Sequence, residues 1–190
     1  MSAADRVRWD TIYQNSNGRY PAADPLLFEY TLPLALHPEP RAEVRALDVA
    51  CGVGQNGLWL AQQGYIVDLM DISRVALLRA RKEMEKRQLR NVNLLQVDLD
   101  TVELERGKYS LVCVFRYLRR DLFKPLAASV CPGGRVIYQS FNRHYLQQVP
   151  GFNPAFLLEI GELALYFDGW DILYQDEMGK TSQLVAQKPR

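Results

Sequence analysis

Short apolar runs alternate along the chain with longer segments in which apolar residues recur at helical spacing. Short runs rich in Val, Leu and Ile are typical of strands that are buried on both faces. Two late runs, 170–174 and 182–187, are separated by a Met-Gly-Lys turn and are predicted to pair as an antiparallel hairpin. Earlier strands are predicted over residues 44–50, 65–70, 92–97, 111–115 and 135–139.

Helices are predicted in the segments between these strands. One begins at Gly57, and a second is N-capped by Ser73 and extends to about Arg87. Others are predicted over residues 121–130 and 159–167. This alternation predicts an α/β fold, with a mainly parallel sheet, helices on both faces and an antiparallel pair at the C-terminal end. Such sheets bind ligands at the carboxyl ends of their strands, so functional residues are expected directly after each strand.

A glycine-rich loop follows the first predicted strand. Residues 52–57 read Gly-Val-Gly-Gln-Asn-Gly, which is the pattern G-x-G-x-x-G between a strand and a helix. Glycines permit a tight turn and a close approach of a ligand to the backbone, and the helix N-terminus offers free N–H groups. Asp71 follows about 20 residues later, where a carboxylate can accept hydrogen bonds from a ribose. The loop therefore indicates an adenosine-containing cofactor, either NAD or S-adenosylmethionine (SAM).

Three features favour SAM over NAD. Asp48 lies just before the glycines, where a carboxylate is unfavourable beside a pyrophosphate but suits a loop that faces the cationic methionine end of SAM. Asp98 ends the third strand, where it could accept a hydrogen bond from the adenine amino group. None of the ten tyrosines is followed by Lys at the spacing of short-chain dehydrogenases, and 190 residues leave no room for a separate substrate domain.

The motifs and their order resemble those of the class I SAM-dependent methyltransferases. The segments that carry the resemblance are LDVACGVGQNGLWLAQQGYIVDLMDIS, QVDLD and CPGGRVIYQSF. Within that superfamily the chain is similar to the TehB-type (tellurite-resistance) methyltransferases, through the patterns CGxGxN and GYxVDxxD and the segment FNPAFLLEIGELALYFDGWDILYQDE. It departs from the TehB pattern after Glu177, where the final hairpin is short.

The resemblance implies a Rossmann-like, seven-stranded, mostly parallel sheet of order 3-2-1-4-5-7-6, with SAM as cofactor and S-adenosylhomocysteine as product. Asn56 stands where this branch commonly has a polar residue, and we expect it to orient the loop. The residues that the resemblance assigns to the cofactor are Asp48, Gly52 and Gly54 at the methionine end, Asp71 and Ile72 at the ribose and adenine, Asp98 and Leu99 at the adenine edge, and Phe115 beside the methionine portion.

The N-terminal segment, residues 1–40, is predicted to form a helical lid. In related small-molecule methyltransferases such a segment folds over the cofactor, and aromatic residues here would help to exclude water. Arg19 and Tyr20 are its candidates for contact with the cofactor or the acceptor. In the alternative interpretation, the segment is a helix that packs on the sheet edge through Trp9 and Ile12.

The residues after the fourth and fifth strands indicate the acceptor. The fourth strand ends in Phe-Arg-Tyr-Leu, which lacks the [DN]-P-P-[YF] motif of amino-group nucleic-acid methylases and the acidic ligands of metal-dependent catechol-type transferases. Arg116 and Tyr117 could bind a compact anion, and His144 is a candidate general base. A hydroxyl acceptor needs such a base, whereas a selenide, telluride or thiolate needs none. We therefore expect a small, soft or anionic acceptor of the chalcogen oxyanion or thiol type, and no metal.

Charge narrows the choice of partner. The chain carries 23 basic and 22 acidic side chains, whereas general nucleic-acid binders normally have a basic excess. The acids of the cofactor loops are balanced by arginines on the acceptor side, which favours a small anionic acceptor over a nucleic acid. The open alternatives are an RNA or protein methyltransferase and a SAM-binding module without turnover. The acceptor-side arginines are Arg116, Arg119, Arg120 and Arg143.

Length and cysteine content complete the expectations. A chain of 190 residues suits a single methyltransferase domain over residues 1–190, as a monomer or homodimer. Three widely spaced cysteines without a CxxC pair argue against a disulfide framework or a zinc site and fit a reducing compartment. No apolar stretch has the length of a membrane span, and the N-terminus lacks the apolar core of a signal peptide. We therefore expect a cytoplasmic protein without a membrane partner.

Overall fold

The computed structural model describes residues 3–16, 18–34 and 44–190 of the chain. Within these ranges seven strands form a sheet in the order β3-β2-β1-β4-β5-β7-β6. The pairs β1–β2, β2–β3 and β4–β5 are parallel, and β7 pairs antiparallel with both β5 and β6. The predicted Rossmann-like α/β fold and its strand order are confirmed. The strands are β1 (Arg45–Val49), β2 (Ile66–Asp71), β3 (Val92–Gln96), β4 (Tyr109–Phe115), β5 (Val130–Phe141), β6 (Asp171–Asp176) and β7 (Thr181–Gln187).

The chain divides into two compact units, residues 1–103 and 104–190, which are described separately. No helix in the described ranges is long and apolar enough to cross a membrane. Unit 1 holds β1 to β3 with the helices α1 (Ala3–Asn15), α2 (Pro25–Tyr30), α3 (Gln55–Gln62) and α4 (Arg74–Lys86). Unit 2 holds β4 to β7 with α5 (Phe123–Ser129), α6 (Glu162–Leu165) and the 3₁₀ helices η2 (Arg120–Leu122), η3 (Arg143–Gln147) and η4 (Pro154–Phe156).

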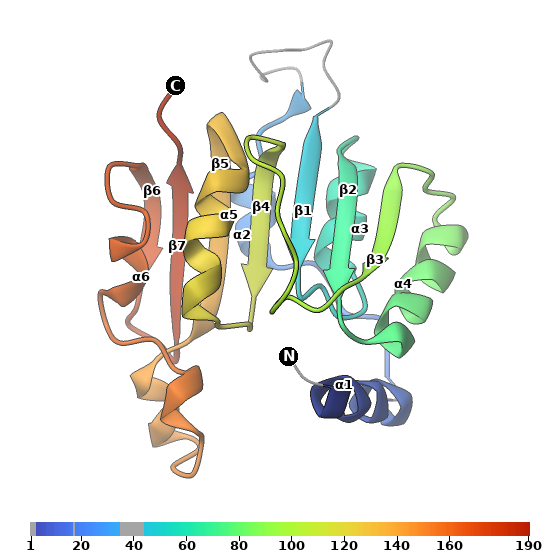
Figure 1. The fold of residues 1–190 in the computed structure, drawn as a ribbon, viewed down its shortest axis with the longest axis horizontal. Helices are drawn as coiled ribbons and strands as arrows, with labels where there is room; N and C mark the ends of the chain where they lie inside the picture. Colours follow the sequence, from blue (N-terminus) through green and yellow to red (C-terminus); the bar gives the residue numbers. More distant parts are fainter. Residues whose placement is uncertain (1–2, 17, 35–43) are drawn as a thin grey trace. The chain divides into compact units, whose positions relative to one another are not determined.

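In unit 1, α3 and α4 pack against the parallel strands and touch each other (Figure 1). The α3 helix lies so close to β2 that a Cβ built on Gly57 would stand 2.1 Å from Leu69 Cδ2. Ser73 caps α4 as predicted, because its Oγ accepts a hydrogen bond from Ala76 N–H at 3.1 Å. Ala76 and Ala80 are fully buried on the inner face of α4. Small residues thus let both helices approach the sheet closely, which fixes where the loops at its carboxyl edge lie.

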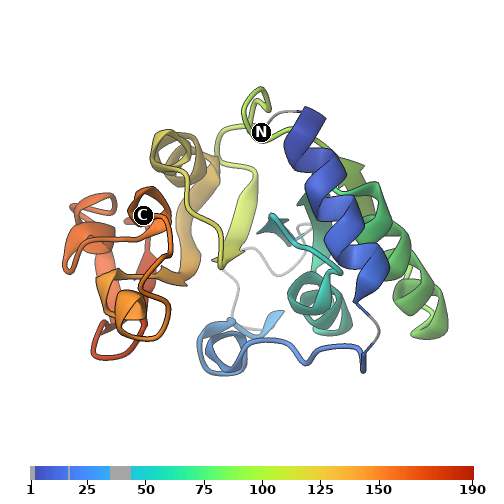
Figure 2. The ribbon, with the colours of Figure 1, turned by 90° about the horizontal axis from the view of Figure 1, so that it is seen from below.

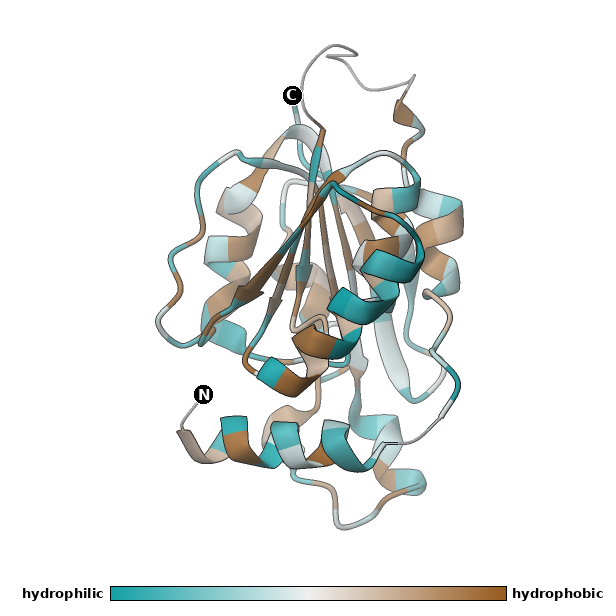
Figure 3. Ribbon diagram, turned by 90° about the vertical axis from the view of Figure 1, so that its right-hand side faces the viewer, coloured by the Kyte–Doolittle hydropathy of each residue, from teal (hydrophilic) through white to brown (hydrophobic). Residues whose placement is uncertain are grey.

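The α1 helix lies beyond the carboxyl ends of β1 and β2 and beside α4 (Figures 1 and 2). Most of its residues are polar (Figure 3). None of them is fully buried. Trp9 and Ile12 remain 37% and 42% exposed. The interpretation in which these two side chains pack the helix on the sheet edge is therefore wrong. Of the segment predicted as a lid, residues 1–2, 17 and 35–40 lie outside the described ranges.

In unit 2, the predicted hairpin is confirmed, since β6 and β7 pair around the turn at residues 177–180. The β5 strand begins earlier than the predicted 135–139, because the Pro-Gly-Gly segment continues into the strand through a bulge in its pairing with β4. The α6 helix is shorter than the predicted 159–167. It begins only after Gly161, because the left-handed backbone of this residue (φ +82°) does not allow the helix to begin earlier.

Candidate functional site

The loop between β1 and α3 has left-handed backbone at Ala50 (φ +52°), Gly52 (φ +57°) and Gly54 (φ +81°). L side chains avoid this region, which accounts for glycine at two of the three positions. A hydrogen bond from Gly54 N–H to Cys51 O at 2.9 Å closes the turn. Both glycines are buried, and a Cβ at Gly54 would stand 2.8 Å from Leu69 Cδ1, so glycine lets the loop pack closely at the carboxyl end of β1.

Asp48 stabilises this loop through the first turn of α3. Its side chain is 1% exposed, and Oδ2 accepts a hydrogen bond from Gly57 N–H at 2.8 Å. A Cβ at Gly57 would stand 3.1 Å from the same oxygen, so glycine is needed for the approach. Asp48 therefore holds the first turn of α3 against β1 and orders the loop indirectly.

Asp71 links the loops that follow β1 and β2. Its Oδ2 accepts from Gly52 N–H at 2.7 Å, and its Oδ1 accepts from Ser73 N–H at 2.8 Å. Burial raises the pKa of the carboxyl above its usual value, against the lowering effect of these two hydrogen bonds. The side chain is 6% exposed, so its charge lies in a poorly solvated setting directly beneath the glycine loop.

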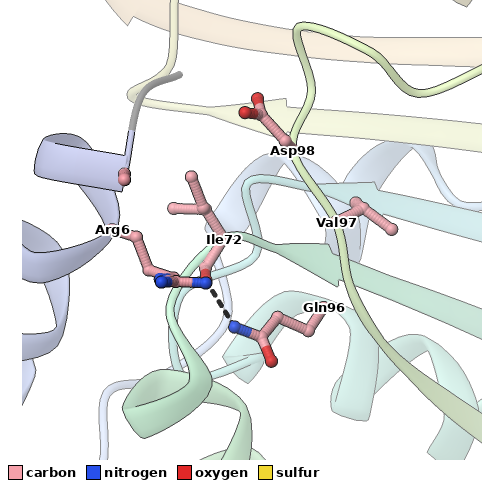
Figure 4. Close-up of a pocket in the computed structure, with 6 residues that line it drawn as sticks. Arg6, Ile72, Gln96, Val97 and Asp98 are labelled. Carbon is pink, nitrogen blue, oxygen red and sulfur yellow. Dashed lines mark hydrogen bonds between the residues drawn. The ribbon is translucent and has the colours of Figure 1, made fainter.

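A pocket of about 320 Å³ opens at the carboxyl ends of β2 and β3 (Figure 4). Gln96 Nε2 donates to Ile72 O at 3.2 Å across one wall. Asp98 Oδ1 accepts from Asp100 N–H at 2.9 Å, which turns the strand end. Leu99 is buried and does not line the space. Ile72 and Asp98 thus border one pocket. The lining residues are Ala3, Arg6, Ile72, Gln96, Val97 and Asp98.

Two polar contacts tie the segment before α2 to the glycine loop. Tyr20 Oη donates to Val53 O at 2.5 Å, and Asp24 N–H donates to the buried Asn56 Oδ1 at 2.9 Å. Burial raises the pKa of the Tyr20 hydroxyl, although nearby Arg87 lowers it, so this hydroxyl stays protonated and donates. Arg19 is exposed. Tyr20 and Asn56 therefore orient the loop through its backbone and its helix.

Sequence reasoning missed the face that α1 turns toward the pocket. Ala3 and Arg6 line it, and Tyr13 Oη stands 2.5 Å from the position of a Cβ on Gly52. Asp10 accepts hydrogen bonds at the N-terminus of α4. Residues 3, 6, 10 and 13 share one helix face, and that spacing was the available signal. A search for apolar residues at helical spacing does not detect this face, because the residues on it are mostly polar.

In unit 2 the candidates for the acceptor side follow β4 and β5. Phe115 is the last, buried residue of β4. Arg116 has left-handed backbone (φ +58°) and an exposed side chain, and Tyr117 is half-buried. The half-buried His144 places Nδ1 3.2 Å from Gly179 O. A carbonyl can only accept, so Nδ1 carries the proton and a neutral ring keeps its lone pair on Nε2.

The positive charge that was expected on the acceptor side is largely neutralised by carboxylates within unit 2. Each of three arginines is paired with a carboxylate within unit 2. Arg119 Nη2 lies 2.8 Å from Asp121 Oδ2, Arg120 Nε lies 2.6 Å from Glu162 Oε1, and Arg143 Nε lies 2.8 Å from Glu159 Oε1. Arg120 also donates to the carbonyls of Ala155 and Leu157. These arginines are held in structural ion pairs, which hydrophobic patterning alone does not reveal.

The described ranges contain no cluster of three or more His, Cys, Asp or Glu side chains that could hold a metal ion. Among the described residues, Cys51, Cys113 and Cys131 form no disulfide bond. Burial raises the pKa of the Cys51 thiol well above its usual value, and the neighbouring Asp48 and Asp71 carboxylates act in the same direction. Cys51 is therefore a packing residue beneath the loop and a poor nucleophile.

The chain is similar in sequence to known methyltransferases. Residues 46–134 match the sequence family described as a methyltransferase domain. The ubiquinone biosynthesis O-methyltransferase of Coxiella burnetii (strain RSA 493 / Nine Mile phase I) is 28% identical over 120 residues, which are 59% of this chain and 51% of that protein. The chain thus spans about half the length of the curated relatives it matches.

Solved structures share the fold. TehB from Haemophilus influenzae matches with a TM-score of 0.68 at 18% identity, over 86% of this chain and 65% of TehB. A SAM-dependent methyltransferase from Aquifex aeolicus matches with a TM-score of 0.60 at 15% identity, over 98% of both chains. At these identities the solved structures show that the chain shares the fold of SAM-dependent methyltransferases, and residues 46–134 are similar in sequence to a methyltransferase domain.

The residues of unit 1 fit SAM, the cofactor that the similarity to a methyltransferase domain implies. A Cβ at Gly52 would stand 2.5 Å from Tyr13 Oη, so only glycine leaves room between this loop and α1. The pocket combines an apolar wall at Ile72 with a carboxylate at Asp98, which suits an adenine ring and its amino group. Unit 2 carries the short turn at residues 177–180, so no long hairpin loop is present there to contact a substrate.

Proposed function

We propose that this protein transfers the methyl group of SAM to a small acceptor and releases S-adenosylhomocysteine. The observation that carries the proposal is the pocket at the carboxyl ends of β2 and β3, which Ile72 and Asp98 border next to a glycine loop of the methyltransferase type. The family match and the fold support it. When bound, SAM supplies an activated methyl group on a sulfonium sulfur.

In this proposal the cofactor residues divide by the part of SAM they serve. The Asp71 carboxylate accepts hydrogen bonds from the ribose hydroxyls, and Ile72 and Asp98 hold the adenine, with Leu99 behind it. Gly52 and Gly54 admit the methionine end to the loop backbone, which Asp48, Asn56 and Tyr20 keep in shape. Phe115 contributes an apolar surface beside the methionine portion, and the exposed Arg19 remains a candidate contact.

We further propose that α1 acts as the lid over the adenosine end. The support is its polar inner face, on which Arg6 lines the pocket, Asp10 caps α4 and Tyr13 lies over Gly52. A helix that is attached by hydrogen bonds and fully buries no side chain can separate from the body at a lower cost than a helix in the core, since less apolar surface has to be exposed. Such a helix can open for cofactor exchange and close to exclude water.

The acceptor that we propose is a small, soft or anionic nucleophile of the chalcogen oxyanion or thiol type. Arg116 supports an anionic acceptor because its exposed guanidinium follows β4 directly, and Tyr117 offers an aromatic hydroxyl beside it. A thiolate attacks the methyl carbon without a base. SAM held by the residues of unit 1 would supply that methyl group, and no residue of this chain would have to accept a proton.

A second candidate acceptor is a hydroxyl group on a small molecule. The curated relatives are named O-methyltransferases, and the Nδ1 contact of His144 leaves Nε2 as a base. In that case the hydroxyl oxygen forms the new bond and His144 takes its proton. We retain the cytoplasm as the proposed location of the protein, and a monomer or homodimer as its proposed oligomeric state. We do not favour RNA or protein as the acceptor. The net charge of only +1 argues against a nucleic-acid substrate.

The proposed function is tested by calorimetric titration with SAM, followed by mass spectrometry of products from thiols, selenite, tellurite and small phenols. We expect micromolar binding of SAM and transfer of one methyl group. Asp71→Ala should weaken SAM binding at least tenfold, whereas Asp168→Ala, an exposed carboxylate in unit 2, should not. Absence of SAM binding, or equal binding by both variants, contradicts the proposal. Tight binding without any methylated product would favour a non-catalytic SAM-binding module.

A further inference from the structure

Arg116 is set apart from the other arginines on its side of unit 2. Arg119, Arg120 and Arg143 each form an ion pair with a carboxylate. The Arg116 guanidinium forms no hydrogen bond or ion pair with any residue in the described ranges, and its side chain is exposed. It therefore has a positive charge to offer to a ligand, whereas the three others could offer theirs only by breaking an ion pair.

The backbone at Arg116 is held in place on both sides. Its φ of +58° is in the left-handed region, which a residue with a long side chain rarely adopts. Arg116 N–H donates to Gln139 O at 2.7 Å, and the next residue, Tyr117, accepts from Tyr138 Oη through its carbonyl at 2.8 Å. Glycine or asparagine would relieve the strain, and the exposed arginine gains no burial in return. Strained residues of this kind cluster at functional sites, where the side chain is needed.

We propose that Arg116 determines acceptor specificity by binding one oxyanionic group, a carboxylate or a compact oxyanion, that the methyl acceptor carries. A guanidinium is always charged and matches such a group through two parallel N–H donors. Since the neighbouring arginines are already paired, the site recognises a monoanion. The inference rests on the proposed function, because it concerns the acceptor of that same reaction.

The position of Arg116 is consistent with this role. It directly follows β4, and His144 follows the parallel neighbour β5 in the same unit. Both residues therefore stand at the carboxyl edge, where α/β sheets bind their ligands. The competing role of Arg116 is contact with the carboxylate of the cofactor itself. The affinity of the variants for S-adenosylhomocysteine separates the two roles.

The test compares acids with their neutral amides as methyl acceptors, using thioglycolate and thioglycolamide for thiol chemistry and protocatechuate and its amide for hydroxyl chemistry. We expect Arg116→Met to lower kcat/KM for the acid about tenfold or more through KM and to leave the amide unchanged. Arg116→Lys should fall between. Arg119→Met is the matched control and should keep the wild-type ratio. Comparing ratios between variants cancels the intrinsic difference in reactivity between acid and amide.

Binding measurements separate this inference from the proposed function. Titration of S-adenosylhomocysteine into each variant should give unchanged affinity, and a weaker affinity in Arg116→Met overturns the inference in favour of cofactor contact. If neither these acceptors nor the thiols, selenite, tellurite and phenols of the wider panel are methylated, the proposed function fails. Titration of the S-adenosylhomocysteine complex with protocatechuate and its amide still decides the inference. A preference for the acid that Arg116→Met abolishes supports it, and equal binding of acid and amide overturns it.

Discussion

The carboxylate of Asp10 accepts a hydrogen bond from the Ser73 hydroxyl at 2.6 Å, and the same oxygen accepts from Val75 N–H at 3.1 Å. Ser73 is the N-cap of α4, so Asp10 places a negative charge where the helix dipole favours one. Arg79 adds a hydrogen bond to Tyr13 O at 3.2 Å. These polar contacts, rather than hydrophobic burial, attach α1 to unit 1.

Removing the Asp10 carboxylate should therefore release α1. A capping carboxylate is worth about 1 kcal/mol, so Asp10→Ala should speed dissociation of SAM about fivefold. Hydrogen exchange of amides in residues 3–15 should accelerate in the same variant, as mass spectrometry of peptides can measure. Gln14→Ala, at an exposed position of the same helix, is the control. Unchanged exchange in Asp10→Ala would show that other contacts hold the helix.

Close packing of α3 on the sheet makes a different prediction. Gly57→Ala introduces a Cβ 2.1 Å from Leu69 Cδ2 and 3.1 Å from Asp48 Oδ2. Overpacking of this kind costs about 1–3 kcal/mol, which urea denaturation can measure as a lower midpoint. Gly151→Ala meets no atom within 4 Å and should change the free energy of unfolding by less than about 0.5 kcal/mol. Equal effects of the two substitutions would contradict the packing argument.

The ion pair between Arg120 and Glu162 predicts sensitivity to acid. Burial raises the pKa of Glu162, but hydrogen bonds from Arg120 and from Glu159 N–H outweigh it and hold the pKa below its usual value. Because the folded pKa is lowered, this stabilisation is present above the ordinary pKa of a glutamate and is lost as the pH falls through the lowered value. Arg120→Gln should flatten the fall of stability in that window.

Thermal unfolding at a series of acidic pH values measures this effect. Arg119→Gln removes a more exposed pair with Asp121 and should keep most of the wild-type slope. A wild-type slope in Arg120→Gln would mean that Glu162 does not contribute to acid unfolding.

Features that depend on residues close together along the chain are the ones that the sequence predicts best. The Ser73 cap and the turn at residues 177–180 depend on adjacent residues, and the strand order followed from the family resemblance. The paired state of Arg120 could not be predicted, because its partner Glu162 is 42 residues away in sequence. The inner face of α1 was missed for a related reason. Its contacts through Asp10 are polar and long-range, so they leave no hydrophobic period to detect.

The buried carboxylate of Asp71 should make the binding of the cofactor depend on pH. Burial raises the pKa of this carboxyl, against hydrogen bonds from Ser73 N–H and Gly52 N–H. As the pH falls from neutral, Asp71 therefore gains its proton at a higher pH than an exposed aspartate does. A protonated carboxyl is a weaker acceptor for ribose hydroxyls, so binding of S-adenosylhomocysteine should weaken as the pH falls through the raised pKa.

Substitution of Asp71 by its neutral isostere tests this assignment. Asp71→Asn should bind S-adenosylhomocysteine about tenfold more weakly at neutral pH, because a hydrogen bond to a charged acceptor is lost. Its affinity should also vary less with pH, since the titrating group is gone. Calorimetric titrations across the acidic range measure both effects, with Asp168→Asn as the control that keeps the wild-type profile. If Asp71→Asn instead retains the wild-type affinity and the wild-type pH profile, Asp71 serves only to join the loops at Gly52 and Ser73.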